Sequence, residues 1–203
     1  MEVRERILKV AEELFMKFGI RSVTMDKIAS ALGISKKTIY LHFEDKDSIV
    51  HEVATLRMDC EVFECENNYE TAENPIDEVY KEIELFKIHA AAMNPVILYD
   101  LKKYYPKTWQ LFQQHKQSVF LEITKRNLRE GVEQGLYRVD INIEILSRLR
   151  MEEIDFAFDQ SVFPQDKFNQ FEVHRTFIDH FLRGILTEKG LGVYEKYITT
   201  RQV

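Results

Sequence analysis

The chain has 203 residues, and its 28 Lys and Arg against 34 Asp and Glu give a formal net charge of −6. Only 7 Gly and 4 Pro interrupt it, a composition typical of an all-α protein of one or two domains. It contains no long apolar run that could span a membrane, and its charged, amphipathic N-terminus is unlike a signal peptide. We therefore expect a cytoplasmic protein with no membrane segment.

The first strongly patterned segment follows Thr24. This residue is a suitable N-cap, and Asp26 places an anion in the first helical turn, where the helix dipole favours it. One buried helix face is indicated by apolar residues at three- and four-residue steps: Met25, Ile28, Ala29 and Leu32. Gly33 adopts the left-handed conformation easily, so we expect the helix to end there in a turn.

A second short helix is expected directly after this turn, with Ser35 as its N-cap. Lys36 and Lys37 fall in its first turn, where a cation opposes the helix dipole by about 0.3–1 kcal/mol. Lys46 repeats this placement at the start of the next helix. Three lysines that each cost free energy at a helix start in one region indicate a compensating interaction outside the chain, and the phosphate groups of DNA are the natural partner.

Two short helices joined by a glycine turn form a helix-turn-helix, whose second helix enters the major groove of DNA. The segment resembles the DNA-binding domain of the TetR family of bacterial regulators. The matching positions are Ile7, Ala11, Leu14, Phe15, Gly19, Thr24, Ile28, Ala29, Gly33, Ile34, Ser35, Thr38, Ile39, Tyr40, His42, Phe43, Lys46 and Ile49. The resemblance implies a helix-turn-helix DNA-binding domain over residues 1–48 and a helical ligand-binding and dimerisation domain over residues 49–203.

The resemblance also implies a role for each polar residue of this segment. Phosphate contacts are expected from Thr24, Tyr40, His42 and Lys46. The groove floor should be faced by Lys36, Lys37 and Thr38, next to the cap Ser35. There a lysine can read guanine O6 and N7, and a threonine methyl can touch thymine. Which of the two lysines reads a base stays open.

The net negative charge lies away from this segment. Residues 1–50 hold nine Lys and Arg against eight Asp and Glu, whereas the rest of the chain holds 19 against 26. We therefore expect modest non-specific affinity for DNA, because the acidic part repels phosphate.

The rest of the chain has the pattern of a helical series. A long helix is expected from Lys46 to about Glu66, followed by a loop over residues 66–75 and a helix capped by Asn74 with Pro75 in its first position. Pro95 and Pro106 should each start or break a helix, and a long helix should run from Pro106 to about Gln134, closed by Gly131 and Gly135. The two last helices are expected over about 142–160 and 166–189. The segment 131–144 also resembles TetR-family proteins, at the junction of their seventh and eighth helices.

The last two helices are expected to form a homodimer, because in the family they pack against their counterparts as a four-helix bundle. The last helix carries more apolar side chains than one core face needs: Phe168, Phe171, Phe177, Ile178, Phe181, Leu182 and Ile185. A two-fold protein reads a palindromic operator in double-stranded DNA. The alternative, that this surface is all intramolecular core, stays open.

A small-molecule effector that releases DNA is implied by the resemblance. Its pocket would lie between the helices of roughly 75–160. Candidate lining residues are Phe86, Met93, Tyr99, Trp109, Phe112, His115, Phe120, Glu152 and Phe156. For each aromatic, the sequence favours a plain core role over pocket lining. An effector lowers DNA affinity if it binds more tightly to a conformation whose recognition helices are too far apart or too close to fit the operator. The long helix from Lys46 is expected to transmit this change, because it spans both domains.

The sequence contains no motif typical of a catalytic site. It lacks Glu-x-x-His, a Walker loop and G-x-S-x-G, and Cys60 and Cys65 are five apart, unlike a redox pair or a metal clip. We expect neither enzyme activity, nor a cofactor, nor a metal. The alternative to a homodimeric repressor is a helical protein-binding adaptor, or a ligand-binding protein without a DNA role, which would have no use for lysines at helix starts.

Overall fold

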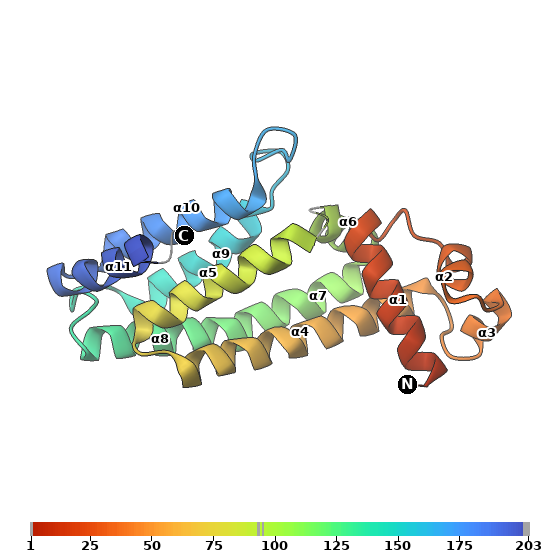
Figure 1. Cartoon of the computed structure of the whole chain (residues 1–203), viewed down its shortest axis with the longest axis horizontal. Coiled ribbons are helices and arrows are strands. Elements are labelled where there is room, and N and C mark those ends of the chain that lie inside the picture. The colour runs from red at the N-terminus through yellow and green to blue at the C-terminus, as the bar shows by residue number, and fades with distance from the viewer. Residues whose placement is uncertain (1, 93, 95, 201–203) are drawn as a thin grey trace. The chain divides into compact units, whose positions relative to one another are not determined.

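The computed structural model describes residues 2–92, 94 and 96–200. Its elements, labelled in Figure 1, are α1 (Val3–Phe18), α2 (Met25–Leu32), α3 (Lys36–Tyr40), α4 (Lys46–Thr71), α5 (Pro75–Ala92), α6 (Val96–Tyr104), α7 (Pro106–His115), the π-helical segment η1 (Lys116–Phe120), α8 (Leu121–Glu133), α9 (Ile143–Ala157), α10 (Gln170–Ile185) and α11 (Glu188–Thr200). The expected all-α fold is confirmed. No helix among the described residues is long and apolar enough to cross a membrane.

The chain forms two compact units. Unit 1 comprises Met1–Glu61 and Ala90–Gln114, and unit 2 comprises Val62–His89 and His115–Val203. The helices α4, α5 and α7 each contribute residues to both units. A separate domain over residues 1–48 stays a prediction, because the division into units groups those residues with parts of α4, α6 and α7.

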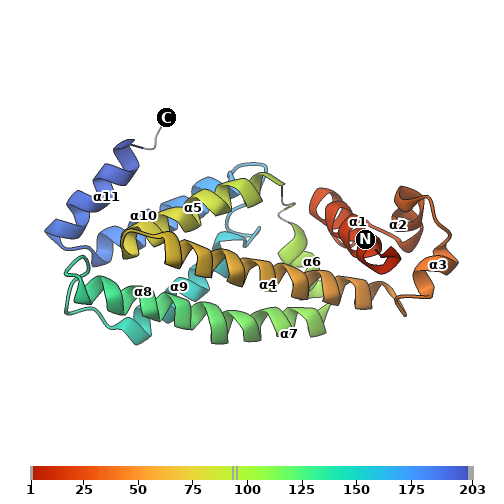
Figure 2. The ribbon, with the colours of Figure 1, turned by 60° about the horizontal axis from the view of Figure 1, so that its bottom comes forward.

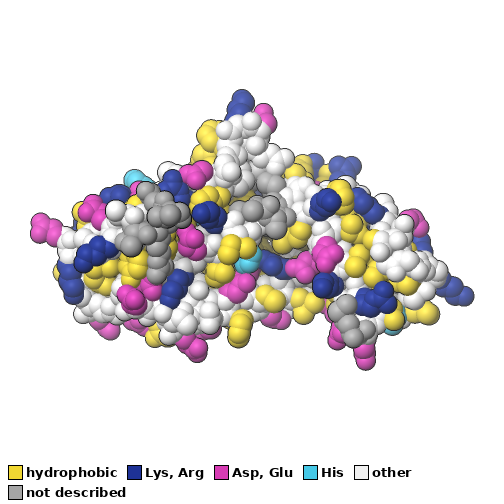
Figure 3. Space-filling model, in the orientation of Figure 1, with side chains coloured by type: hydrophobic (Ala, Val, Ile, Leu, Met, Phe, Trp, Pro, Cys, Tyr) yellow, Lys and Arg dark blue, Asp and Glu magenta, His cyan; other side chains and the backbone are white. Residues whose placement is uncertain are grey.

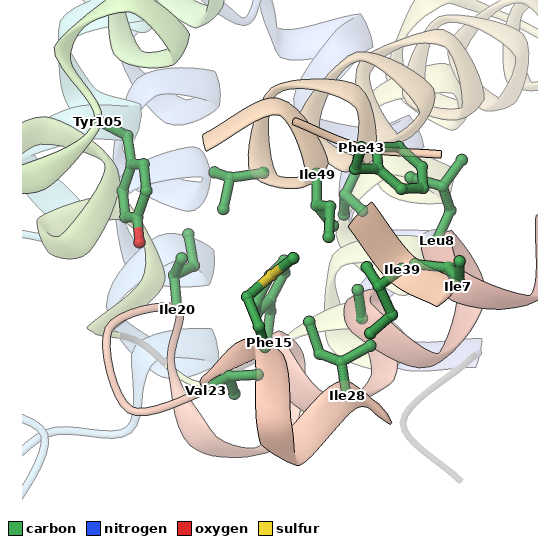
Figure 4. Packing of buried hydrophobic residues seen from close by; sticks show 14 of the residues in the cluster. Ile7, Leu8, Phe15, Ile20, Val23, Ile28, Ile39, Phe43, Ile49 and Tyr105 are labelled. Atoms are coloured by element: carbon green, nitrogen blue, oxygen red, sulfur yellow. The ribbon is translucent and has the colours of Figure 1, made fainter. Parts of the chain in front are cut away.

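The core of unit 1 is built from the helical stripes that the sequence indicates (Figure 4). On α1, Ile7, Ala11 and Phe15 recur at four-residue steps, and all three are buried. Ile28 from α2 and Ile39 from α3 are 0% exposed in the same cluster. Burial of each large apolar side chain contributes about 1.5–3 kcal/mol, so this core holds the short helices α2 and α3 in place.

The helix α6 is fastened to the turn that follows α1. The backbone N–H of Arg21 donates a hydrogen bond of 2.8 Å to Oδ2 of Asp100, a side chain that is only 3% exposed. The Arg21 guanidinium donates to the hydroxyl of Tyr104 at 2.8 Å. The backbone N–H of Asn94, just before α6, donates to the carbonyl of Met16 at 2.8 Å. These bonds join segments about 80 residues apart in sequence, beyond the range of local patterns.

Unit 2 has its own core, in which α8 packs on α9 and α9 on α10 (Figures 1 and 2). The fully buried ring of Tyr137 rests against Gly131 of α8. Its hydroxyl donates to Oδ1 of Asn127 at 3.1 Å, and Nδ2 of Asn127 donates to Glu78 at 2.7 Å. This buried network fixes the chain where it turns after α8.

A buried histidine lies in the same unit. His174 of α10 is 3% exposed, and its ring centroid lies 4.0 Å from that of Phe86. Burial, together with the nearby guanidinium of Arg150, lowers the pKa of His174 to about 3. The imidazole is therefore neutral at physiological pH.

Several expected helix boundaries are wrong. The helix α4 continues to Thr71 instead of ending near Glu66, so most of the expected loop is helical. The expected helix from Pro106 contains the π-helical segment η1. The N-cap of α10 is Asn169, which accepts a 3.2 Å hydrogen bond from the backbone of Glu172, so the helix starts later than 166.

The last expected helix is divided, and α11 was not expected. The break falls at Leu186, whose backbone is extended and forms an isolated antiparallel bridge with Tyr137. A Cβ on Gly190 would lie 2.1 Å from the carbonyl oxygen of Leu136, so this glycine permits α11 to approach the preceding turn. Tertiary contacts, not local propensity, interrupt the helix here.

Candidate nucleic-acid interface

The helix α2 begins and ends at the predicted residues. Oγ1 of Thr24 accepts a hydrogen bond of 3.2 Å from the backbone of Lys27. Gly33 has the left-handed φ of +66°, and its N–H bonds to the carbonyl of Ser30 at 3.2 Å. The chain therefore turns directly from α2 into α3, as the sequence predicts.

The helix α3 is short and capped by Ser35, whose Oγ accepts a 3.1 Å hydrogen bond from the backbone of Thr38. The helix ends at Tyr40, although a further backbone bond joins Phe43 to Ile39 at 3.0 Å. His42, a predicted phosphate contact, lies in the turn that follows α3.

The side chains of α3 and its turn are divided into two faces. Ile39 and Phe43 are 0% and 3% exposed and anchor the segment to the core of unit 1. The opposite side, which we call the α3 outer face, consists of the exposed residues Lys36, Lys37, Tyr40, Leu41 and His42. Because the buried anchors fix the helix, this face presents its donors in one defined orientation.

Leu41 belongs to this face as well, although no role was predicted for it. It is 76% exposed, which is unusual for a leucine on a short, well-anchored segment. An apolar side chain here can contact a thymine methyl group in the major groove. The signal in the sequence is a lone apolar residue between the outward-facing Tyr40 and His42.

The structure distinguishes the two adjacent lysines. Nζ of Lys36 donates to Oδ2 of Asp26 at 3.0 Å, and this hydrogen bond raises the pKa of the Lys36 ammonium. Both side chains are well exposed, so the pair is screened by solvent and exchangeable. Lys37 is exposed and makes no ion pair within the part of the chain that the structure describes. Its charge is the more available one.

Lys46 does not lie with these cations. Its Nζ donates to the carbonyl oxygen of Ile20 at 2.6 Å, and it lies 5.8 Å from the ring centroid of Tyr105. Burial lowers the pKa of this ammonium. The expected phosphate contact of Lys46 stays a prediction. In the structure this side chain ties the start of α4 to the turn after α1.

Arg4, at the start of α1, stabilises the position of the turn that follows α3. No role was predicted for this residue. Its guanidinium pairs with the carboxylate of Glu52 on α4 and lies 5.0 Å from the ring centroid of Phe43. It therefore holds α1, α4 and the turn after α3 together. A pairing across 48 residues has no local signal in the sequence.

Charges of both signs lie over the α1–α3 region in Figure 3, where Lys and Arg side chains are interspersed with Asp and Glu. This agrees with the near balance of charge in residues 1–50. Local placement of lysines on the α3 outer face, rather than a broad basic surface, therefore makes the region suitable for phosphate and base edges.

The predicted effector residues fall in both units. In unit 1, Tyr99 is half exposed and its hydroxyl accepts a 2.7 Å hydrogen bond from Lys103. The rings of Trp109 and Phe112 contact each other at a tilt, with centroids 5.5 Å apart, and Phe112 also lines a cavity in unit 1. Met93 lies outside the described residues.

In unit 2, Phe86 packs on His174, and His115 packs edge-on against Phe120 at 5.2 Å. Nε2 of His115 is buried and has no hydrogen-bond partner among the described residues. Phe156 is 47% exposed. Whether these side chains share one pocket stays a prediction.

Glu152, the remaining predicted effector residue, is engaged by a buried lysine. Nζ of Lys116, in η1, lies 3.8 Å from Glu152 and 2.6 Å from Asp155. Lys116 is 1% exposed, so both carboxylates compensate a charge that would otherwise be buried alone. Within the described ranges, no group of three His, Cys, Asp or Glu side chains could hold a metal ion.

Residues 7–53 match the family described as "Bacterial regulatory proteins, tetR family". An uncharacterized HTH-type transcriptional regulator of Bacillus subtilis, YerO, is 28% identical over 149 residues, which cover 72% of this chain and 45% of the relative. An HTH-type transcriptional regulator of Staphylococcus aureus is 37% identical over 62 residues, 30% of this chain and 32% of the relative. The matches therefore span less than half the length of these curated relatives.

Solved structures share the fold over most of the chain. A regulator from Saccharomonospora viridis in complex with choline has a TM-score of 0.75 at 20% identity, covering 91% of this chain and 98% of that one. A TetR-family regulator from Agrobacterium tumefaciens has a TM-score of 0.74 at 16% identity, covering 91% and 97%. FadR from Bacillus subtilis in complex with stearoyl-CoA has a TM-score of 0.64 at 18% identity, covering 89% and 98%.

Proposed function

Because the chain belongs to the TetR family of bacterial regulators, we propose that it is a sequence-specific DNA-binding transcription regulator. It acts as a homodimeric repressor that a small molecule releases from a palindromic operator. It is a binding protein rather than an enzyme, and its place of action is the cytoplasm, where bacterial DNA lies.

The observation that carries this proposal is the α3 outer face. Lys37, Tyr40 and His42 are exposed together, and the buried anchors Ile39 and Phe43 on the opposite side hold them in position. Rigid presentation lets a side chain reach a base edge at little further entropic cost. Lys37 reads a base, and Lys36 exchanges Asp26 for a phosphate when DNA binds. The N-cap residues Thr24 and Ser35 face the phosphate backbone of the DNA on either side of the groove. Thr38 lies beside Lys37, the residue that contacts the base.

Dimerisation is supported by the exposed apolar side chains of α9. Ile145, Leu149 and Phe156 are 62%, 48% and 47% exposed, and their spacing places them on one side of the helix. On α10, Ile178 and Leu182 are 0% exposed and satisfy the core of unit 2. The surface of α9 is therefore surplus to that core, and a second copy of α9 and α10 would cover it.

Release by an effector follows from the placement of α4, which contributes residues to both units. An effector bound among the aromatic side chains of unit 2 shifts α4 and so changes the separation of the two α3 helices in the dimer. The buried Nε2 of His115, which lacks a partner among the described residues, is available to a polar group of the effector. Phe86 and Phe120 supply apolar contact, whereas Phe156 belongs to the proposed dimer surface.

Selection from a random double-stranded DNA library tests the proposal, at about 150 mM salt. The variants are the double alanine at Lys36 and Lys37 and a matched double alanine at Lys107 and Lys167, two exposed lysines outside α3. We expect wild type and the matched variant to enrich one palindrome and the first variant to enrich none. Folded wild-type protein that enriches no sequence, after denaturation and refolding to remove co-purified ligand, contradicts the proposal.

A further inference from the structure

A cavity of about 110 Å³ lies inside unit 1, and none of its lining residues belongs to α3. Its walls are apolar side chains of neighbouring helices, which do not fill the space between them. Phe15 and Met16 come from α1, Ala54 and Met58 from α4, and Leu98 from α6. Ala54 stands where a larger side chain at the same helical position would fill the space.

The closed end of this cavity is apolar and buried. Phe15 and Ile20, both labelled in Figure 4, belong to the core of unit 1 and line the cavity as well. Met58 and Leu101 are 5% and 6% exposed. These apolar walls offer water few hydrogen-bond partners, so an apolar occupant would supply dispersion contacts that water does not.

The charged residues of the cavity lie together at its more exposed edge. Nε of Arg57 is 3.8 Å from Oε1 of Glu12, and its terminal nitrogen is 3.7 Å from Oε1 of Glu61. These charges compensate one another, and they leave a surplus negative charge that repels an anion. A cation that moved past this edge would lose its hydration without a buried partner. An uncharged occupant avoids both costs.

We propose that this cavity binds a small uncharged apolar molecule of about the size of benzene. A dry cavity of about 150 Å³ lined by Leu, Ile and Phe binds benzene in another protein, so the volume here is of the right order. Met16 and Met58 are unbranched and polarizable, and they can adjust to a slightly larger ring and contact its edge. Phe112, one of the predicted effector residues, lines this cavity, whereas the proposed function places its effector among residues of unit 2.

The binding test contains no DNA, so its outcome is independent of the proposed function. The full chain is labelled with ¹³C at its methionine methyl groups and titrated with benzene. Met16 and Met58 line the cavity, whereas Met25 in unit 1 and Met151 in unit 2 do not. We expect saturable shifts at Met16 and Met58 and none at the other two.

Two variants localise the binding. Ala54→Leu fills the cavity and should weaken benzene binding by about tenfold or more. The matched control Ala31→Leu makes the same change on the exposed side of α2 and should bind as wild type does. Leu98→Ala enlarges the cavity from a partly exposed wall position, and should admit naphthalene, which the wild-type cavity excludes. It tests the proposal even if Ala54→Leu fails to fold.

Absence of saturable shifts at Met16 and Met58 would overturn the proposal. Equal shifts at all four methionines would also overturn it, because they would mark non-specific partitioning of benzene. So would naphthalene binding that is unaltered by Leu98→Ala.

Discussion

Gly131 is a position at which one added methyl group should destabilise this protein strongly. A Cβ there would lie 2.0 Å from Cδ2 and 2.2 Å from Cε2 of the Tyr137 ring. That ring is 0% exposed, and its hydroxyl donates to Asn127 at 3.1 Å, so it cannot move aside freely. Gly131→Ala therefore forces a strained helix–ring contact together with the loss of the buried hydrogen bond.

The magnitude follows from three contributions. Overpacking costs about 1–3 kcal/mol. A buried Asn127 left without its donor costs about another 1–3 kcal/mol. The helix propensity of alanine over glycine returns about 1 kcal/mol. We expect a net loss of about 3 kcal/mol in the free energy of unfolding, which lowers the melting temperature by roughly 6–12 °C for a chain of this size.

Urea unfolding followed by far-UV circular dichroism measures this loss. The matched control is Gly192→Ala, also inside a helix, where a Cβ would meet nothing within 4 Å. That change should leave stability unaltered or raise it by up to about 1 kcal/mol. The reasoning is refuted if Gly131→Ala unfolds at the same urea concentration as Gly192→Ala, because the ring contact would then have no cost.

Three further results are expected. Lys37→Ala should weaken binding to the selected DNA more than Lys36→Ala, because Lys36 already shares its charge with a carboxylate; fluorescence anisotropy measures both. Asp100→Ala should lower the free energy of unfolding by about 1.5–3 kcal/mol in urea titrations, because the backbone N–H of Arg21 loses a charged acceptor. Between pH 6.5 and pH 5 the wild type should lose about 1.6 kcal/mol through His174, since the unfolded imidazole takes up a proton near pH 6.5 and the folded one only near pH 3. His174→Leu should remove that loss.

Each of these has a contrary outcome. Equal losses for Lys36→Ala and Lys37→Ala would mean that the pair with Asp26 does not matter in the complex. Unaltered unfolding of the Asp100 variant would mean that α6 is held by its apolar contacts alone. A His174→Leu variant with the same pH dependence as wild type would assign the loss to other histidines.

The helix-turn-helix was predictable because its signals are local. Thr24 caps α2, the positive φ of Gly33 ends it, and Ser35 caps α3, all within a dozen residues. The inward side chains Ile39 and Phe43 follow from helical spacing alone. Each of these features depends on near neighbours in the sequence, and the structure has each of them.

Features that depend on distant segments were not predictable. Leu186 interrupts the last expected helix through a bridge to Tyr137, some fifty residues earlier. Lys46 lies at a helix start as predicted, but its ammonium group donates a hydrogen bond to the carbonyl oxygen of Ile20. The cavity beside Ala54 exists only because side chains from four helices meet. A single sequence contains no signal for such pairings.

The central claim is that the α3 outer face recognises a specific DNA sequence. The most direct measurement compares the affinity for the selected palindrome with that for a scrambled duplex, at two salt concentrations. The proteins are wild type, the double alanine at Lys36 and Lys37, and the matched double alanine at Lys107 and Lys167. We predict that the first variant loses the preference, at least about a hundredfold, and binds both duplexes alike, whereas the matched variant keeps it. A variant without Lys36 and Lys37 that still prefers the palindrome as wild type does would contradict the account.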